Sequence, residues 1–384
     1  MKELFMELFS GFSSIGWKEL VMFLVGIILI YLAIKKEYEP MLLLPIGFGC
    51  ILVNLPFSVV WETMEKGESI PGFLQILHNS GIQNDLFPVL IFIGVGAMID
   101  FTPLFKNPIM IFFGAAAQFG IFATMLAAVA FGFDLPVAAA IGIIGAADGP
   151  TAIYVGNKFA PEHFAAISVA AYSYMALVPI IQPPVIRLCT TKKERLIRMD
   201  YHEEPVPRVT KIIFPISITL IAGLLVPNSA PLVGSLMFGN LVRECGVLER
   251  LSKTAQNELA NLVTLLLGIT IGGTMKAANF LTLDTIKIMT LGLVAFIFDT
   301  AGGVYFAKFI NLFLKKKINP MIGGAGISAF PMSSRVIQKM AQKEDPTNFV
   351  LMQAVSANVS GQLGSIVAGG LVLSLIPMLT GIGG

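Results

Sequence analysis

Long apolar runs, separated by short polar or Gly- and Pro-containing segments, dominate the chain. A membrane-spanning α-helix needs about 20 mostly apolar residues, and on this rule two sets of six segments are candidate membrane elements. They are residues 19–34, 41–58, 87–101, 108–132, 136–155 and 163–187, followed by 211–226, 229–247, 258–278, 285–312, 319–342 and 347–377. The pattern predicts an all-α polytopic membrane protein.

The segments divide the chain into four parts. Residues 1–18 mix charged and apolar residues without a small-residue cleavage site, so we interpret them as an N-terminal amphipathic segment rather than a signal peptide. Residues 19–187 and 211–384 form two membrane repeats, and the hydrophilic residues 188–210 form a cytoplasmic linker between them.

The two halves share short motifs in the same order. Ile144 to Ala147 matches Ile322 to Ala325, and Met41 to Asn54 matches Leu232 to Arg243. Such internal repeats are typical of transporters. The halves therefore predict an inverted-repeat, transporter-like architecture.

The positions of the basic residues predict the orientation in the membrane. Cytoplasmic loops carry an excess of Lys and Arg, and this rule is satisfied if residues 136–155 and 319–342 enter the membrane and return without crossing. The residues then placed in the cytoplasm are Lys35, Lys36, Lys106, the charges from Arg187 to Lys211, Arg243, Arg250, Lys315 to Lys317, Arg335, Lys339 and Lys343. We therefore expect about ten transmembrane helices, two re-entrant or broken hairpins, and halves of opposite orientation.

Composition narrows the function classes. The chain is 55% hydrophobic and 13% charged, with a formal net charge of +2, so nothing indicates nucleic-acid binding. Three scattered cysteines and three histidines favour neither a disulfide framework nor a transition-metal centre.

The first hairpin carries a charge inside an apolar segment. Gly145 and the sequence Asp148-Gly149-Pro150 interrupt the helix, since proline removes a backbone donor. Unwound backbone at membrane depth survives only where it is buried in protein or lines a cavity. An ionised Asp148 there costs about 2.5 to 3.5 kcal/mol even on lenient insertion scales, so it needs a partner such as a cation.

The second hairpin supplies oxygens without a carboxylate. It begins at Asn319-Pro320, contains Gly323 and Ser328, and leads to Arg335. Two hairpins that enter from opposite faces bring their tips together near the midplane, the usual place for an ion site. The helices that follow the hairpins add the polar residues Tyr172, Ser173, Tyr174, Ser356, Asn358, Ser360, Gln362 and Ser365.

One carboxylate among neutral oxygens favours a small monovalent cation, because hard cations prefer oxygen ligands and divalent ions draw in more carboxylates. Sodium is the leading choice, and a proton competes for Asp148. Structural alternatives stay open at this point: Asp148 or Asn319 as a helix cap, the tyrosines as interfacial residues, Ser360 and Gln362 as interhelical contacts, and Arg335 as an orienting charge. Asp299 is the rival coupling carboxylate.

The combination of Gly145 to Thr151, Asn319 to Arg335 and Asn358 to Gly361 resembles the β subunits of the sodium-pumping, biotin-dependent decarboxylases, which act on oxaloacetate, methylmalonyl-CoA or glutaconyl-CoA. The resemblance runs nearly end to end. It implies a bacterial inner-membrane translocase that decarboxylates carboxybiotin and couples this to Na⁺ export with proton consumption. The alternative is a secondary Na⁺/solute symporter or Na⁺/H⁺ antiporter on the same plan.

The resemblance also implies residue roles. Asp148, Asn319 and Asn358 would be sodium ligands, Tyr174 and Ser328 would belong to a second ion or proton-exchange site, and Gly323 would allow close backbone approach there. Arg335 would meet the carboxylate of carboxybiotin.

Partners follow from the same resemblance: a carboxyltransferase (α) subunit, a biotin carrier that presents carboxybiotin, and a small membrane-anchored accessory subunit. A homo-oligomer of the β subunit stays open. Oxaloacetate-type members tend to have less polar residues at the positions of Ser360 and Gln362. This difference favours a CoA ester as the substrate.

Overall fold

A computed structural model describes residues 9–65, 68–199 and 205–381. The first half contains α2 (Ser10–Ser13), α3 (Trp17–Lys36), α4 (Pro40–Asn54), β1 (Glu62–Glu65), β2 (Glu68–Pro71), α5 (Phe73–Leu77), η1 (His78–Ile82), α6 (Leu86–Met98), α7 (Thr102–Lys106), η2 (Pro108–Met110), α8 (Ile111–Ala117), α9 (Phe119–Ala130), α10 (Leu135–Gly142), η3 (Ile143–Ala146), α11 (Gly149–Phe159), η4 (Pro161–His163), α12 (Phe164–Ala176) and α13 (Val178–Cys189).

The second half follows the short linker helix α14 (Lys192–Arg195). It contains α15 (Arg208–Leu225), η5 (Pro227–Ser229), α16 (Ala230–Glu244), α17 (Glu249–Thr254), η6 (Ala255–Leu259), α18 (Ala260–Thr274), α19 (Ala277–Phe280), α20 (Leu283–Ile310), η7 (Pro320–Gly326), α21 (Met332–Glu344) and α22 (Leu351–Thr380). Each predicted apolar segment corresponds to helical structure. The protein is therefore a predominantly α-helical, multi-pass membrane protein.

Helix length alone identifies fewer spans than the charge pattern predicts. Within the described residues, five helices are long and apolar enough to cross a membrane, or seven if each of two bent pairs counts as one span. The candidate membrane element at 163–187 is such a pair, since α12 and α13 meet at an angle of 71° near Leu177. The predicted element is present, but it is bent, and hydropathy does not register a bend between two apolar helices.

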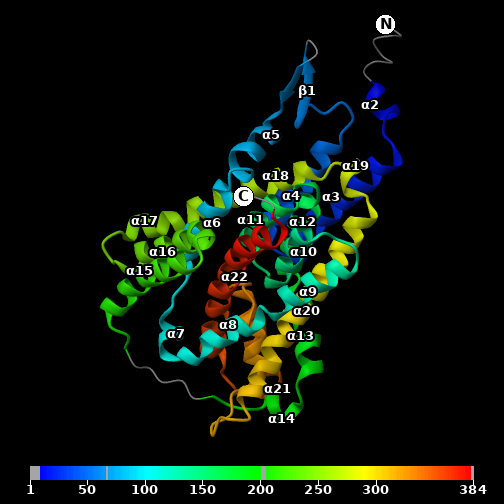
Figure 1. Ribbon diagram of the computed structural model, residues 1–384. Helices are drawn as coiled ribbons and strands as arrows, with labels where there is room; N and C mark the ends of the chain where they lie inside the picture. Colours follow the sequence, from blue (N-terminus) through cyan, green and yellow to red (C-terminus); the bar gives the residue numbers. More distant parts are fainter. Residues whose placement is uncertain (1–8, 66–67, 200–204, 382–384) are drawn as a thin grey trace.

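A small β-structure departs from the all-α prediction. Strands β1 and β2 pair antiparallel, with Glu62 opposite Pro71 and Glu65 opposite Glu68, and they project from one end of the molecule (Figure 1). Of the predicted N-terminal amphipathic segment, residues 1–8 lie outside the described residues, and only α2 and the start of α3 are seen. Helices α14 and α21 lie at the end opposite the strands (Figure 1).

Two helix pairs join the halves of the chain, and each pair takes one helix from each half. Helix α4 of the first half packs on α18 of the second, and α16 of the second packs on α6 of the first. The sequence Phe-Gly occurs at both crossings: Gly49 meets the backbone of Ile269, and Gly239 meets that of Ile93. A side chain at either glycine would collide with the opposite carbonyl, so the two crossings depend on the same local feature.

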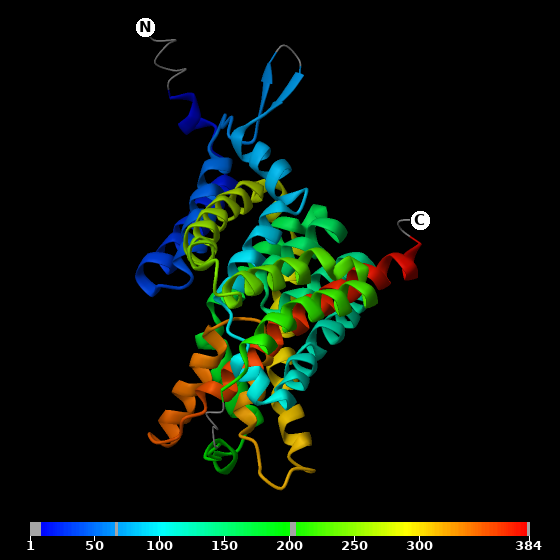
Figure 2. The same ribbon diagram turned by 90° about the vertical axis from the view of Figure 1, so that its left-hand side faces the viewer.

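The C-terminal helix α22 runs through the interior, and Figures 1 and 2 show it passing obliquely through the bundle. It packs against α8, η7, α21 and α11. Most of its residues from Gln353 to Val372 are buried, including several polar side chains. This helix therefore brings polar groups into the region where the two hairpins lie.

Candidate functional site

The first hairpin breaks at Asp148. Helix α10 ends at Gly142, the 3₁₀ turn η3 follows, and Ala147 adopts a left-handed conformation with φ 53°. Asp148 is extended and caps α11, with its Oδ1 accepting from the Thr151 amide at 3.4 Å, and Pro150 lies in the first turn. The cap predicted as an alternative is therefore present. It leaves the second carboxylate oxygen free for other partners.

The second hairpin reaches the first at its tip. The 3₁₀ segment η7 ends at Gly326, and the chain then passes through Ser328 before α21 begins. The Ser328 amide donates to the Ala146 carbonyl at 2.9 Å, and its hydroxyl donates to Asp148 Oδ2 at 3.3 Å. The prediction that the two tips meet is confirmed.

Helix α22 completes the surroundings of the carboxylate. Asp148 Oδ2 accepts from the Ser365 hydroxyl at 2.6 Å and from Gln362 Nε2 at 3.1 Å, while Ser365 and Ser328 hydroxyls lie 3.0 Å apart. Asp148 is only 3% exposed. Its hydrogen-bond donors in the described structure are all neutral. A buried carboxylate with no cationic partner is costly, so this arrangement favours entry of a cation.

Several buried oxygens around the carboxylate lack partners. Within the described residues, no hydrogen bond reaches Asn358 Oδ1, Thr151 Oγ1 or the Tyr172 hydroxyl. Asn358 is fixed by its Nδ2, which donates to the Ile327 carbonyl of the second tip at 2.7 Å. Unsatisfied buried oxygens are uncommon in native proteins and are the groups that a hard cation uses as ligands.

A cavity of about 170 Å³ opens onto this cluster. Its polar lining includes Asp148, Tyr172, Ser328 and Gln362, and Glu39 of the segment before α4 also lines it. The remaining lining residues are Leu42, Ile91, Phe92, Val95, Ala147, Gly149, Pro150, Met175, Thr264 and Phe330. The cavity has room for a cation with a few water molecules.

Some residues predicted for the site lie elsewhere. Asn319 caps η7, and its Nδ2 donates to the linker carbonyls of Arg195 and Ile197, both at 2.9 Å. The Tyr174 hydroxyl donates to the Met289 carbonyl of α20, on a different side from Tyr172. The structure therefore does not bring Asn319 or Tyr174 into hydrogen-bond contact with Asp148, because other backbone groups already engage their polar atoms.

Gly323 lies at a close backbone approach between η7 and α20. A Cβ atom at this position would collide with the Gly303 carbonyl, so only glycine fits there. The contact positions the hairpin, and it does not involve Asp148.

The sequence named Tyr172, Gln362 and Ser365 as polar residues on the helices that follow the hairpins, but it predicted neither these three nor Thr151 as ion ligands. A usable signal was present in α22, where Asn358, Gln362 and Ser365 follow one another at spacings of four and three and so share a helix face. Ser360, in contrast, contacts the Ile111 carbonyl and the Gly114 amide, as expected for an interhelical contact.

A second cavity, of about 410 Å³, lies between α13 and α21. Its charged lining consists of Arg187, Arg335, Lys339 and Lys343, and its apolar lining consists of Pro179, Pro183, Met332, Val336 and Met340. None of the four cations pairs with a carboxylate in the described part of the chain. The cavity therefore suits a ligand with an apolar ring and a negative charge.

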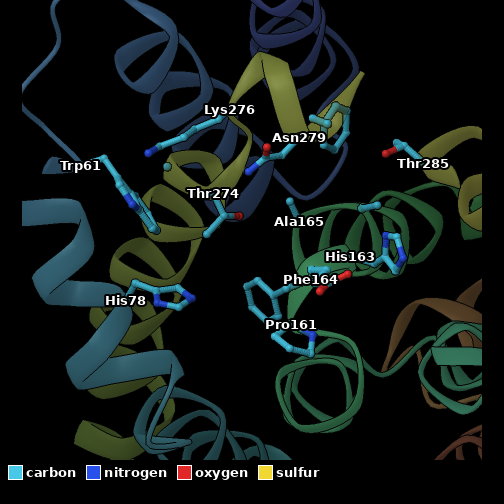
Figure 3. Close-up of a pocket in the computed structure, with 14 residues that line it drawn as sticks. Trp61, His78, Pro161, His163, Phe164, Ala165, Thr274, Lys276, Asn279 and Thr285 are labelled. Atoms are coloured by element: carbon cyan, nitrogen blue, oxygen red, sulfur yellow. The ribbon is translucent and has the colours of Figure 1, made fainter. Parts of the chain in front are cut away.

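A third cavity, of about 230 Å³, lies near the β-strands and contains His78 and His163 (Figure 3). Lys276 at its edge donates to Glu62 at 2.8 Å, and this hydrogen bond together with the lysine charge lowers the pKa of the Glu62 carboxyl. A lysine in the lining disfavours a cation. This cavity is therefore a weaker candidate for an ion site than the one at Asp148.

These features define a multi-pass membrane protein with a buried carboxylate where two broken hairpins meet. The chain belongs to the family of Na⁺-transporting oxaloacetate decarboxylase beta subunits, which it matches over residues 18–376.

Named relatives extend over almost the whole chain. The glutaconyl-CoA decarboxylase subunit beta of Acidaminococcus fermentans is 52% identical over 367 residues, which cover 96% of each chain. The methylmalonyl-CoA decarboxylase subunit beta of Propionigenium modestum is 49% identical and covers 95% of this chain and 97% of its own. The oxaloacetate decarboxylase beta chain of Klebsiella pneumoniae is 44% identical with the same coverage.

Proposed function

We propose that this chain is the integral-membrane β subunit of a biotin-dependent decarboxylase sodium pump, which couples decarboxylation of carboxybiotin to Na⁺ export with consumption of a proton. The family supports this function over a secondary symporter or antiporter. The observation that carries it is Asp148, a carboxylate that is 3% exposed and surrounded by neutral donors and unpartnered oxygens.

The sodium ligands in this proposal come from both hairpins and from α22. Asp148 supplies the negative charge, and Ser328, Ser365 and Asn358 Oδ1 supply neutral oxygens. A single carboxylate neutralises a monovalent ion, whereas Mg²⁺ and Ca²⁺ usually require more charge. Asn319 was predicted as a further ligand, but in this conformation its amide is bound to the linker carbonyls. The role of Tyr174 in proton exchange and the role of Gly323 near the ion site remain predictions.

Carboxybiotin would bind in the cavity between α13 and α21. Arg335 presents a guanidinium group, which can hold a carboxylate through two parallel hydrogen bonds. The proline and methionine side chains provide apolar surface for the fused rings. Lys339 and Lys343 on the same helix add positive charge toward an incoming anionic group.

One hairpin links the two sites. Arg335 lies in the first turn of α21, only seven residues after Ser328 at the tip. Helix α13, which lines the other side of the cavity, also contacts this hairpin: its Gln182 donates to the Gly324 carbonyl at 2.6 Å and to the Ser333 hydroxyl at 2.8 Å. Binding or release of carboxybiotin in the cavity would therefore shift the second hairpin, whose Ser328 contacts Asp148. Export against 100 mV requires about 2.3 kcal/mol per Na⁺, which decarboxylation would supply.

We also propose ten crossings, with the two halves forming an inverted repeat. The reciprocal packing of α4 on α18 and of α16 on α6 supports a two-fold relation between the halves. The β-strands with Glu62 and the linker with Arg195 lie at opposite ends (Figure 1), which supports an outer and a cytoplasmic face, respectively.

In this proposal the chain resides in the bacterial inner membrane with a carboxyltransferase subunit, a biotin carrier and a small membrane-anchored subunit. The named CoA-ester relatives are 49 to 52% identical and the oxaloacetate relatives 44%. We therefore propose a CoA ester as the source of the carboxyl group.

The test is release of CO₂ from carboxybiotin by the reconstituted complex, with and without Na⁺. The pump predicts that Na⁺ accelerates release and that ²²Na⁺ enters liposomes only while carboxybiotin is consumed. Sodium transport by the purified chain alone, without the carrier, would instead support the secondary transporter.

A further inference from the structure

Asp299 is a second carboxyl group inside the membrane domain, and the proposed sodium site does not use it. It lies in the middle of the 28-residue helix α20 and is fully buried, with an exposed fraction of 0%. Neither of its carboxyl oxygens has a hydrogen-bond partner in the described part of the structure. The neighbouring Thr300 hydroxyl is likewise buried and unpartnered.

Two glycines allow the backbone of η3 and of α9 to pack directly against this carboxyl group. A methyl group added at Gly145 of η3 would lie 2.6 Å from Asp299 Oδ2, and one added at Gly120 of α9 would collide with Oδ1. The space is therefore too small for a sodium ion with its ligands. The backbone N–H groups of Gly120 and Ile121, in the first turn of α9 after the helix breaks at Gln118, face the carboxyl group without meeting hydrogen-bond distance and angle.

No cation in the described structure neutralises Asp299. The segments packed around the middle of α20 are α8, α9, α10, η3 and η7, and none of them contains an Asp, Glu, Lys, Arg, His, Tyr or Cys residue. Helix α12 contributes Tyr172 and Tyr174, and α13 contributes Arg187 and Cys189 near the far end of α20. The charges of α20 itself, Asp284, Lys287 and Lys308, lie at least nine residues away, and Tyr305 is exposed.

We infer that Asp299 is a proton-binding site of the transport cycle, which holds a proton in this conformation and exchanges it when the first hairpin moves. This inference rests on the proposed function. A buried acid without a partner is far cheaper as the neutral acid than as the anion, and a proton needs no cavity. The first-turn amides of α9 can stabilise the anion when the contact with η3 loosens.

The link to sodium is geometric. Gly145 precedes Asp148 by three residues, so the segment that covers Asp299 belongs to the same break that carries the sodium ligand. A shift of this break on sodium binding or release would change the space around Asp299. The exchange itself is simple: the carboxylate gains one proton to become the acid, or the acid loses it, and no other bond changes.

The experiment uses the reconstituted complex in liposomes and compares the unsubstituted protein with Asp299→Asn and Asp284→Asn. Asp284 is on the same helix but exposed and paired with Lys287, so it is the matched control. We expect Asp299→Asn to lose an infrared carbonyl band of a protonated carboxyl group and to lose the pH dependence of Na⁺-driven turnover. Asp284→Asn should retain both.

Two results would overturn the inference: an unchanged carboxylic-acid band in Asp299→Asn, or an unchanged pH profile. If Asp299→Asn does not assemble, the Asp148→Asn complex supplies the answer, since it still contains Asp299 and must keep the acid band. Absence of Na⁺-dependent turnover in the unsubstituted complex would instead refute the proposed function itself.

Discussion

The Ser328 hydroxyl donates to the Asp148 carboxylate at 3.3 Å, and this contact joins two chain breaks that lie 180 residues apart. The same serine holds the Ala146 carbonyl through its amide. Each broken hairpin thereby satisfies polar groups that the other one leaves free. An ion at Asp148 would respond to the position of both hairpins.

Ser365 should contribute strongly to sodium affinity. Its hydroxyl lies 2.6 Å from Asp148 Oδ2, and a hydrogen bond to a charged group is worth about 1.5 to 3 kcal/mol. Ser365→Ala should therefore raise the Na⁺ concentration for half-maximal decarboxylation by roughly ten- to a hundredfold. Ser360→Ala, on the same helix but bonded to Ile111, is the control and should change it little. Equal effects of the two substitutions would contradict the site.

Arg335 should act on carboxybiotin and not on sodium. Arg335→Lys keeps the charge but loses the planar pair of donors, so we expect a higher KM for the carboxylated carrier at unchanged Na⁺ dependence. Arg250→Lys, on α17 and outside the cavity, serves as the matched control. The idea fails if Arg335→Lys shifts the Na⁺ dependence and leaves the KM for the carrier as it was.

Asn319 should stabilise the linker. Its amide donates to the carbonyls of Arg195 and Ile197, and its oxygen caps η7. Asn319→Ala should lower the thermal unfolding temperature, since losing a cap alone costs about 1 kcal/mol. Half-saturation by Na⁺ should change by less than roughly threefold, which is below 1 kcal/mol. A large loss of Na⁺ affinity at unchanged stability would restore the sodium-ligand role predicted from the sequence.

The ion pair between Arg198 and Asp345 should make linker docking depend on pH. Hydrogen bonds from Thr347 and Arg198 lower the pKa of the Asp345 carboxyl. A lowered pKa means that the stabilisation is present above the ordinary Asp pKa and disappears as the pH falls through the lowered value. Proteolysis within the linker should accelerate on acidification toward that value. Arg198→Ala should already be susceptible at neutral pH and less sensitive to acid, and identical acid profiles would refute the contact.

The sequence predicted much of the fold because apolar length and the positions of Gly and Pro are local properties. The breaks at Asp148 and before Ser328 follow directly from Gly-Pro and Asn-Pro segments. The bend at Leu177 and the break at Gln118 could not be predicted from hydropathy, because the residues on both sides are apolar. The pair of strands β1 and β2 was missed because it lies in a polar segment outside the predicted membrane elements.

The site was harder to predict than the fold, because its partners are distant in sequence. Ser365 and Gln362 lie more than 200 residues from Asp148, and their spacing fits interhelical contacts as well as ion binding. Asn319 was grouped with Asp148 by resemblance, whereas the folded linker occupies its amide. Which oxygen meets which carboxylate depends on tertiary packing.

The most direct test of the central claim is Na⁺-stimulated CO₂ release from carboxybiotin by a reconstituted complex carrying Asp148→Asn. The substitution keeps the shape of the side chain and removes the buried charge that the cation would neutralise. We predict loss of both Na⁺ stimulation and ²²Na⁺ uptake, with the complex still assembled. Retention of either one at the level of the unsubstituted complex would contradict the account.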